Sequence, residues 1–215
     1  MSLRRNAAAA DFVDVLEPRR LFAAGPLVIN GSALNDVIEI NQTATAYVIT
    51  INGVAQTHPF ANVNKIDVHG GDGDDIVIAS AALTLGFYAD GGNGNDRMIG
   101  GQGPDTFLGA AGKDQLYGGL GNDRLNGAGG NDKVLGEAGS DRLYGGDGND
   151  YIDGGSSLDR MDLGNGLDTA FGGGGDDLFY AIDSTKDELY GASGRDTATV
   201  DSIDLRFSVE HAAIV

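Results

Sequence analysis

From Gly91 to Tyr180 the chain repeats one pattern of hydrophobic and polar positions every nine residues, ten times in succession and without an insertion. Position eight of each unit is apolar, from Met98 in the first unit to Phe179 in the last. Glycine occupies position one and position four in nine of the ten units. A single apolar position between two polar ones is typical of a short, half-buried strand, and the glycines before it are typical of a tight turn.

A strand of three residues cannot bury a core alone, but it can do so when copies of it are stacked. Two units, or eighteen residues, would then form one coil of strand, turn, strand and turn. Strands of successive coils would lie about 4.8 Å apart, with the residues of position eight meeting inside a thin core between two sheets. The period therefore predicts an all-β fold of stacked parallel coils.

The sequence on either side of the ten units carries weaker copies of the same pattern. A full unit lies at residues 70–78, and Asp75 and Asp96 are separated by one coil plus three residues, which predicts a small bulge around Leu83–Tyr88. After Tyr180 the phase slips by one residue, and one more unit follows at residues 191–199. We expect four segments: a disordered or weakly helical leader (1–25), an N-terminal β cap containing the unit at 70–78 (26–90), the ten tandem units (91–180) and a C-terminal repeat with a cap (181–215).

Composition narrows the classes of partner. The 32 acidic and 14 basic residues give a net charge of −18, which argues against nucleic acid as a partner because phosphate binding needs a basic surface. The absence of cysteine excludes disulfides and thiolate metal sites. No apolar run is long enough to predict a transmembrane helix. An extracellular protein of this composition needs another source of stability, such as a bound metal.

Position six of all ten units is aspartate, and this is the feature that points to a metal. Because successive units alternate between the two edges of the stack, aspartates eighteen residues apart should be neighbours. Two carboxylates about 5 Å apart repel by roughly 3 kcal/mol at an effective dielectric constant of 20, so a stack without cations should be unstable. Calcium fits these turns best, because it accepts six to eight oxygen ligands, including backbone carbonyls. Zinc prefers nitrogen and sulfur, and the chain has three histidines and no cysteine.

Units such as GGNGNDRMI (91–99) and GGDGNDYID (145–153) resemble G-G-x-G-x-D-x-U-x, the calcium-binding nonapeptide of the RTX, or repeats-in-toxin, family. The resemblance implies a right-handed parallel β-roll, a β-solenoid, with Ca²⁺ bound in the turns and irregular β caps. It also implies export by type I secretion machinery and an extracellular location, secreted or at the cell surface. Four gaps between turns on each edge predict roughly eight calcium ions. The expected ligands are Asp75, Asp96, Asp105, Asp114, Asp123, Asp132, Asp141, Asp150, Asp159, Asp168, Asp177 and Asp196.

Two units depart from the consensus. One has Ser157 in place of the position-four glycine and Leu158 next to Asp159, and the next unit begins with Leu163 in place of glycine. We expect calcium to be weakly bound or missing near Asp159 and near Asp168.

Arginines occupy position seven of three alternate units, so Arg124, Arg142 and Arg160 should stack on one outer face. This row is either a small patch for an anionic glycan or another partner, or a set of charges that offsets nearby aspartates and keeps sheets from pairing face to face. At the other end of the chain, residues 16–24 resemble an LEPR-x-L-type motif that occurs at the N-terminus of many bacterial surface and secreted repeat proteins.

The sequence offers no candidate active site. His58, His69 and His211 are scattered, and neither a zinc-protease motif nor a nucleophile elbow is present. The many carboxylates form a ladder of equivalent environments, whereas a glycosidase needs two in different environments. We therefore expect a calcium-binding protein, not an enzyme, that is secreted or held at the cell surface and folds when calcium binds. The alternatives are a calcium-dependent adhesin or binding module, or the stabilising tail of an exported enzyme.

Overall fold

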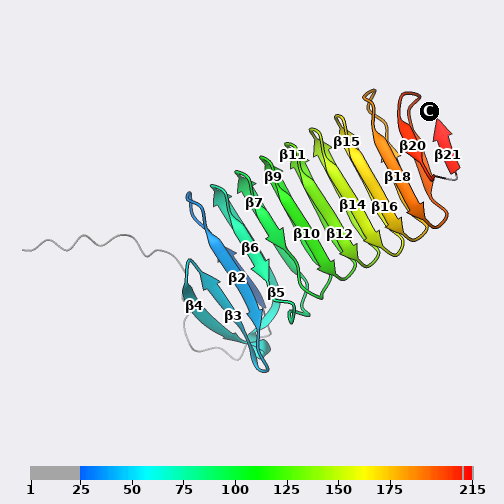
Figure 1. The fold of residues 1–215 in the computed structure, drawn as a ribbon. Helices are drawn as coiled ribbons and strands as arrows, with labels where there is room; N and C mark the ends of the chain where they lie inside the picture. Colours follow the sequence, from blue (N-terminus) through cyan, green and yellow to red (C-terminus); the bar gives the residue numbers. More distant parts are fainter. Residues whose placement is uncertain (1–24, 210, 215) are drawn as a thin grey trace, which may run out of the picture.

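The computed structural model describes residues 25–209 and 211–214, and these form a stack of coils with one sheet on each side (Figure 1). Sheet A has ten strands and sheet B has eleven. From residue 63 to residue 207 the chain passes alternately from one sheet to the other, with odd-numbered strands in sheet A and even-numbered strands in sheet B. The expected leader lies outside the described residues, apart from Gly25 at the start of β1.

Strands next to each other in either sheet come from successive coils and run parallel. The strands of sheet A, in spatial order, are β1 (Gly25–Asn30), β5 (Val63–Asp72), β7 (Phe87–Asn93), β9 (Thr106–Ala111), β11 (Arg124–Gly129), β13 (Arg142–Asp147), β15 (Arg160–Asn165), β17 (Leu178–Ala181), β19 (Thr197–Val200) and β21 (His211–Ile214). Those of sheet B are β4 (Val54–Pro59), β3 (Ala46–Ile51), β2 (Val37–Gln42), β6 (Ile76–Ala79), β8 (Arg97–Ile99), β10 (Gln115–Leu120), β12 (Lys133–Ala138), β14 (Tyr151–Ser156), β16 (Thr169–Gly174), β18 (Glu188–Ser193) and β20 (Leu205–Phe207).

The register of the sheets follows the eighteen-residue coil. Leu116 of β10 pairs with Val134 of β12, and Leu125 of β11 pairs with Leu143 of β13. The predicted all-β fold, a parallel β-solenoid, is therefore confirmed. In the described part of the chain, no helix is long and apolar enough to cross a membrane.

The core is a single column of side chains between the two sheets. The position-eight side chains are almost completely buried, and each large one contributes roughly 1.5–3 kcal/mol of hydrophobic stabilisation. Phe87 and Phe107 pack against each other at the N-terminal end of the column, with ring centroids 5.1 Å apart. The column continues through Met98, Phe107, Leu116, Leu125, Val134, Leu143, Ile152, Met161, Ala170 and Phe179.

The N-terminal end of sheet B is closed by the antiparallel strands β2, β3 and β4. A two-residue turn joins β3 to β4, and its residues Asn52 and Gly53 have φ values of +48° and +80°. Asn-Gly is the sequence that such a hairpin turn prefers, because both residues must adopt the left-handed conformation. The 3-10 helix η1 (Phe60–Asn62) then leads from β4 into β5 in sheet A.

The additional residues between Asp75 and Asp96 lie in the connection from β6 to β7, at residues 80–86. Leu83 from this connection is fully buried in the core. Its carbonyl oxygen accepts a hydrogen bond of 2.7 Å from the backbone N–H of Gln102 in the next coil. The bulge is thus held by a buried anchor and by the neighbouring turn.

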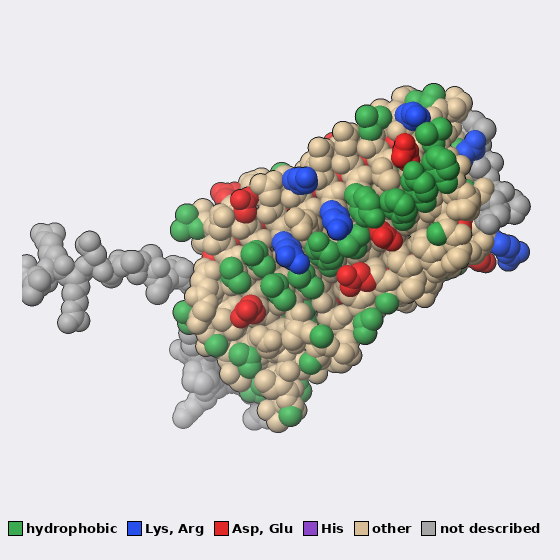
Figure 2. Space-filling model, viewed as in Figure 1, with side chains coloured by type: hydrophobic (Ala, Val, Ile, Leu, Met, Phe, Trp, Pro, Cys, Tyr) green, Lys and Arg blue, Asp and Glu red, His purple; other side chains and the backbone are tan. Residues whose placement is uncertain are grey.

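A band of hydrophobic side chains follows the outer face of sheet B (Figure 2). Within it, Phe171, Tyr190 and Phe207 stack in register, with successive ring centroids 4.7 Å apart and planes within 11° of parallel. Because the ring faces cover one another, mainly ring edges are left to contact solvent.

Candidate metal centre

The position-six aspartates form two hydrogen-bonded ladders, one along each edge of the stack. In each step the backbone N–H of one aspartate donates to Oδ1 of the aspartate one coil later, as from Asp114 to Asp132 at 2.8 Å. Ladder one consists of Asp36, Asp75, Asp96, Asp114, Asp132, Asp150, Asp168, Asp187 and Asp204. Ladder two consists of Asp105, Asp123, Asp141, Asp159, Asp177 and Asp196.

The carboxylates of these ladders are buried, and one oxygen of most of them has no protein partner. Exposure of the members from Asp75 to Asp196 does not exceed 3%. A buried oxygen that has left water without gaining a hydrogen bond costs free energy, and a buried charge costs more unless it is paired. Oδ2 is buried without a hydrogen-bond partner in Asp75, Asp96, Asp114, Asp123, Asp132, Asp141, Asp150, Asp159, Asp168, Asp177 and Asp187.

In the units that open with glycine, this oxygen lies over that glycine. A Cβ atom placed on Gly109 would lie 2.4 Å from Oδ2 of Asp114 and 2.7 Å from the carbonyl oxygen of Gly127 in the next coil. A side chain at Gly109 could not be placed there without moving these two oxygens. A carboxylate oxygen and a backbone carbonyl oxygen from successive coils therefore lie close to the same side of the glycine, and oxygens of both kinds are calcium ligands.

The turns themselves need left-handed backbone conformations at positions two and four. Gly112, at position four, has a φ of +138°, and a Cβ there would lie 1.8 Å from the carbonyl oxygen of Gly94 in the preceding coil. Glu137 at position two and Ser157 at position four adopt this region with side chains, at φ values of +72° and +80°. Non-glycine residues in this region carry strain of order 1–3 kcal/mol.

Asparagine at position five links the outer rims of the turns. Oδ1 of Asn131 accepts a hydrogen bond of 2.8 Å from the backbone N–H of Asn149, and Oδ1 of Asn149 accepts one of 2.9 Å from Leu167. Oδ1 of Asn95 and Oδ1 of Asn122 accept the same kind of hydrogen bond from a backbone N–H in the next coil, that of Lys113 and that of Ser140. This role of position five was not expected from the sequence, although asparagine recurs there.

Burial raises the pKa of the ladder carboxyl groups. Desolvation raises the pKa of Asp114 and of Asp123 to about 7 and that of Asp159 to about 8, and neighbouring aspartates of the same ladder add to the increase. Hydrogen bonds from the backbone oppose the shift without cancelling it. A site that disfavours the carboxylate when empty is one that a divalent cation would neutralise.

The first residue of each ladder differs from the interior members because protein groups satisfy both of its oxygens. Oδ2 of Asp36 accepts hydrogen bonds from the backbone N–H and the hydroxyl of Ser32, at 2.6 and 2.9 Å, and Oδ1 accepts one from Asn52. Oδ2 of Asp105 accepts a hydrogen bond of 3.0 Å from the backbone N–H of Gly101. These ends of the ladders are closed by the chain itself.

Three ladder members were not among the residues expected from the sequence. Asp187 has the same buried, partnerless Oδ2 as the interior members, and the one-residue phase slip had obscured it. Asp36 and Asp204 lie in glycine-poor segments. Asp36 comes two residues before the buried Ile38, which was a signal of the repeat pattern, whereas Asp204 comes two residues before the exposed Arg206 and carries no such signal.

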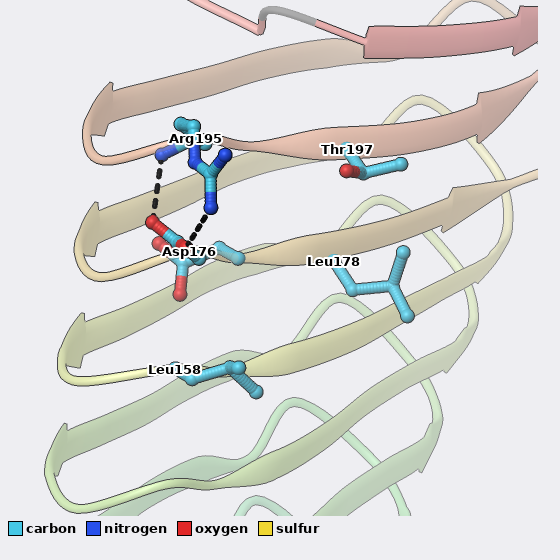
Figure 3. Close-up of a pocket in the computed structure, with 6 residues that line it drawn as sticks. Leu158, Asp176, Leu178, Arg195 and Thr197 are labelled. Atoms are coloured by element: carbon cyan, nitrogen blue, oxygen red, sulfur yellow. Dashed lines mark hydrogen bonds and ion pairs between the residues drawn. The ribbon is translucent and has the colours of Figure 1, made fainter.

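The two units that depart from the consensus keep the geometry of the ladder. Oδ1 of Asp159 accepts a hydrogen bond of 2.8 Å from Asp141, and Leu163 is fully buried. Leu158 is 55% exposed and lies at a shallow hollow beside Asp176 and Arg195 (Figure 3). Weak calcium binding in these units stays a prediction, and the left-handed Ser157 is its better-supported cause.

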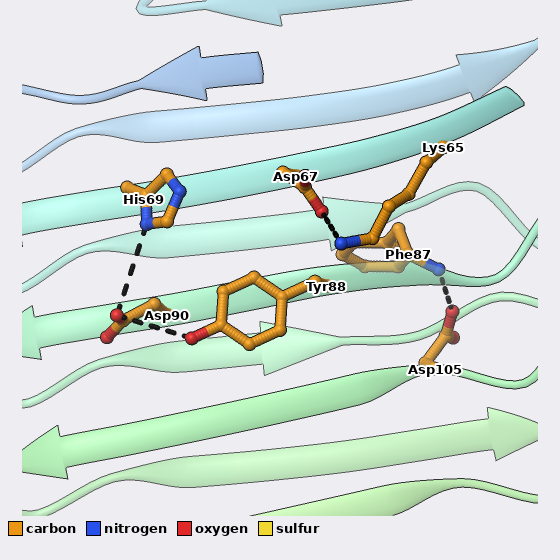
Figure 4. Close-up of polar contacts among 7 residues, drawn as sticks. All are labelled: Lys65, Asp67, His69, Phe87, Tyr88, Asp90 and Asp105. Atoms are coloured by element: carbon orange, nitrogen blue, oxygen red, sulfur yellow. Dashed lines mark hydrogen bonds and ion pairs between the residues drawn. The ribbon is translucent and has the colours of Figure 1, made fainter. Parts of the chain in front are cut away.

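A polar cluster on the outer face of sheet A contains the one His–carboxylate contact among the described residues (Figure 4). Nδ1 of His69 lies 4.0 Å from Oδ2 of Asp90, which also accepts a hydrogen bond of 3.4 Å from the hydroxyl of Tyr88. The side chain of His69 is 46% exposed on an open sheet face. Nothing in this cluster encloses a substrate.

The oxygens present fit calcium when the backbone is included. Among the described residues, no three His, Asp or Glu side chains come together at one point. A cation in these turns would therefore be held by one or two ladder carboxylates together with carbonyl oxygens of the glycine turns. Calcium accepts such mixed oxygen ligands, whereas magnesium requires tighter geometry and retains water.

Stacked parallel coils with buried aspartate ladders over glycine turns define a class of repeat proteins that bind calcium between their turns. The sequence model of the RTX calcium-binding nonapeptide repeat matches this chain in four copies, at residues 68–81, 90–125, 126–161 and 154–181. The chain thus belongs to the RTX calcium-binding repeat family. No curated protein matches it.

Proposed function

We propose that calcium switches this protein from an unfolded to a folded state. The chain would then be unfolded inside the cell and folded outside it. The observation that carries the proposal is the series of buried Oδ2 atoms without a protein partner. At neutral pH, folding without a cation would require these carboxylates either to bind protons or to be buried as unpaired charges. Calcium removes that cost, so its binding free energy becomes folding free energy.

The proposed location is extracellular, either secreted or at the cell surface. Calcium modules of the extracellular type bind with dissociation constants of roughly 10⁻⁴–10⁻³ M, far weaker than cytosolic sensors. A chain with this affinity would remain unfolded before export and would fold outside. Type I secretion machinery, which the family resemblance implies, is the proposed route.

The proposed number of ions is roughly eight. The estimate comes from the gaps between successive turns of the ten tandem units. The ladder geometry supports binding along both edges, since members of each edge have a partnerless Oδ2. The closed end at Asp36 supports a cap that folds without its own ion.

We also propose that the described part of the chain is not catalytic. The exposed position of His69 beside Asp90, on an open face, supports this view. A role as the stabilising tail of an exported enzyme would be favoured by hydrolase activity that a substitution outside the repeats abolishes.

Limited proteolysis tests the switch. Protein dialysed against a chelator should be cleaved throughout residues 91–180, and calcium in the millimolar range should protect this region, because buried backbone in a folded roll is inaccessible to a protease. Magnesium at the same concentration is the control and should not protect. Equal protection with chelator and with calcium would contradict the proposal.

A further inference from the structure

The outer face of sheet A carries three arginines in one row. Arg124 of β11 pairs in register with Arg142 of β13, which pairs with Arg160 of β15. All three side chains are exposed. Neighbouring strands lie about 4.8 Å apart, and like charges directly opposite each other across strands are destabilising. The row therefore costs folding free energy that some other interaction must offset.

No carboxylate among the described residues forms an ion pair with these arginines. Among the residues that the structure describes, the ion pairs join Lys65 to Asp67, His69 to Asp90 and Arg195 to Asp176, and the three arginines take part in none of them. This is notable in a chain with 32 acidic residues. The reading of the row as a means of offsetting adjacent aspartates is thus not supported by the contacts.

Two of the guanidinium groups are instead held by aromatic rings. The guanidinium carbon of Arg124 lies 4.7 Å from the ring centroid of Tyr144, and that of Arg160 lies 4.5 Å from the ring of Tyr180. Such cation–π contacts stabilise the arginine side chain on the sheet. A cation–π contact engages no N–H donor in a hydrogen bond to carboxylate, so the donors of these guanidinium groups remain available for carboxylate or sulfate.

We propose that this row binds a linear anionic polysaccharide lying along the long axis of the roll. The row is a single side chain wide and crosses successive coils, which matches an extended polymer that presents spaced acidic groups. The adjacent row, in register along Asn126, Tyr144, Asp162 and Tyr180, provides donors and acceptors for sugar hydroxyls. Binding rests on the proposed function, since the row exists only in the folded roll.

The narrow width of the row favours a polysaccharide over two other polyanions. Nucleic acid and anionic bilayers present dense negative charge over a wide area, and most of that charge would lie beyond a row of three arginines that is one side chain wide. A polysaccharide with one acidic group in every one or two sugar rings can place these groups against the arginines. Its neutral hydroxyls then lie over the surface on either side of the row. Asp162 within the adjacent row disfavours densely charged ligands further.

The test measures binding of hyaluronate and chondroitin sulfate oligosaccharides to the full chain, with dextran as the neutral control. The triple variant R124Q/R142Q/R160Q should lose affinity about tenfold or more, because arginine–carboxylate contacts are charge-assisted hydrogen bonds. The matched control R97Q/K113Q/K133Q removes the same charge from residues outside the row and should bind like the wild type. Circular dichroism with calcium and with chelator is recorded on each sample, so that a failure of the calcium switch is seen separately.

Three results would overturn the proposal. The first is wild-type protein, folded by circular dichroism, that binds neither acidic oligosaccharide more tightly than dextran. The second is equal loss of affinity in the two triple variants. The third is binding to phosphatidylserine vesicles that the arginine substitutions abolish while oligosaccharide binding stays unchanged, which would assign the row to a membrane surface.

Discussion

The side-chain amide of Asn52 donates a hydrogen bond of 2.5 Å to Oδ1 of Asp36, in the place where every later ladder aspartate accepts one from a backbone N–H of the preceding coil. Within residues 25–209 no earlier ladder aspartate precedes Asp36, and the amide of Asn52 takes the place of that backbone donor. Oδ1 of Asn52 also accepts a hydrogen bond of 2.9 Å from the backbone N–H of Val37. One hairpin residue thereby closes the end of ladder one.

Substitution of this residue should destabilise the cap. Asn52→Gly keeps the left-handed turn but leaves Oδ1 of the buried Asp36 without the amide donor, and we expect a loss of about 1–3 kcal/mol in the free energy of unfolding. Asn52→Asp, which retains the shape and adds a like charge, should destabilise the protein more. Urea denaturation at saturating calcium measures both changes, and wild-type stability in Asn52→Gly would argue against the closing role.

Removal of one interior carboxylate should separate calcium binding from folding. Asp132→Asn keeps an oxygen able to accept the hydrogen bond from Asp114 but removes the charge. We expect fewer bound ions and a higher calcium midpoint, together with a more stable calcium-free state. Asp162→Asn on the outer face, with the same change of charge, should leave the ion number unchanged by calorimetric titration. Equal ion numbers in wild type and Asp132→Asn would remove Asp132 from the set of ligands.

The pKa shifts of the ladders predict a pH dependence for the calcium-free protein. The folded-state pKa values of Asp150, Asp168 and Asp159 are raised to about 6, 7 and 8, mainly by desolvation. Since these values lie above the unfolded value near 4, the stability from protonation is fully present below pH 4 and is lost as the pH rises through about 6 to 8.

In chelator, acidification from pH 8 to pH 5 should therefore increase the β-sheet signal, because protons replace calcium. In the presence of calcium the same acidification should raise the calcium midpoint. Circular dichroism across this range checks both, with sodium chloride held constant. A calcium-free protein that loses β-sheet on acidification would show that carboxylate burial does not limit its folding.

Ser157→Gly should restore the consensus turn. It removes a side chain from a left-handed position and should raise stability by about 1 kcal/mol, together with calcium affinity near Asp159 and Asp177. Glu137→Gly relieves the same strain at position two of a consensus turn and should raise stability without adding an ion. Calorimetric titration distinguishes the two, and an unchanged calcium isotherm for Ser157→Gly would show that this turn already binds fully.

The repeat period made the central architecture predictable. Every one of the ten units has an apolar residue at position eight and an aspartate at position six. The buried column and the alternation of aspartates between two edges therefore follow from the sequence spacing. The contacts of Asn52, Asp187 and Asp204 could not be predicted in the same way, because they depend on how irregular segments pack against the last regular coil. The burial of the carboxylates was also not predicted. It depends on a close approach of Oδ2 to the Cα of the glycine at position one, as between Asp114 and Gly109, and sequence spacing does not reveal this contact.

The most direct test of the central claim is a calcium titration followed by far-ultraviolet circular dichroism at pH 7.5, with magnesium as the control. The buried, partnerless Oδ2 atoms predict a cooperative gain of β-sheet signal with calcium and little change with magnesium. A protein that shows the full β-sheet signal in chelator at this pH, and does not respond to calcium, would contradict the account.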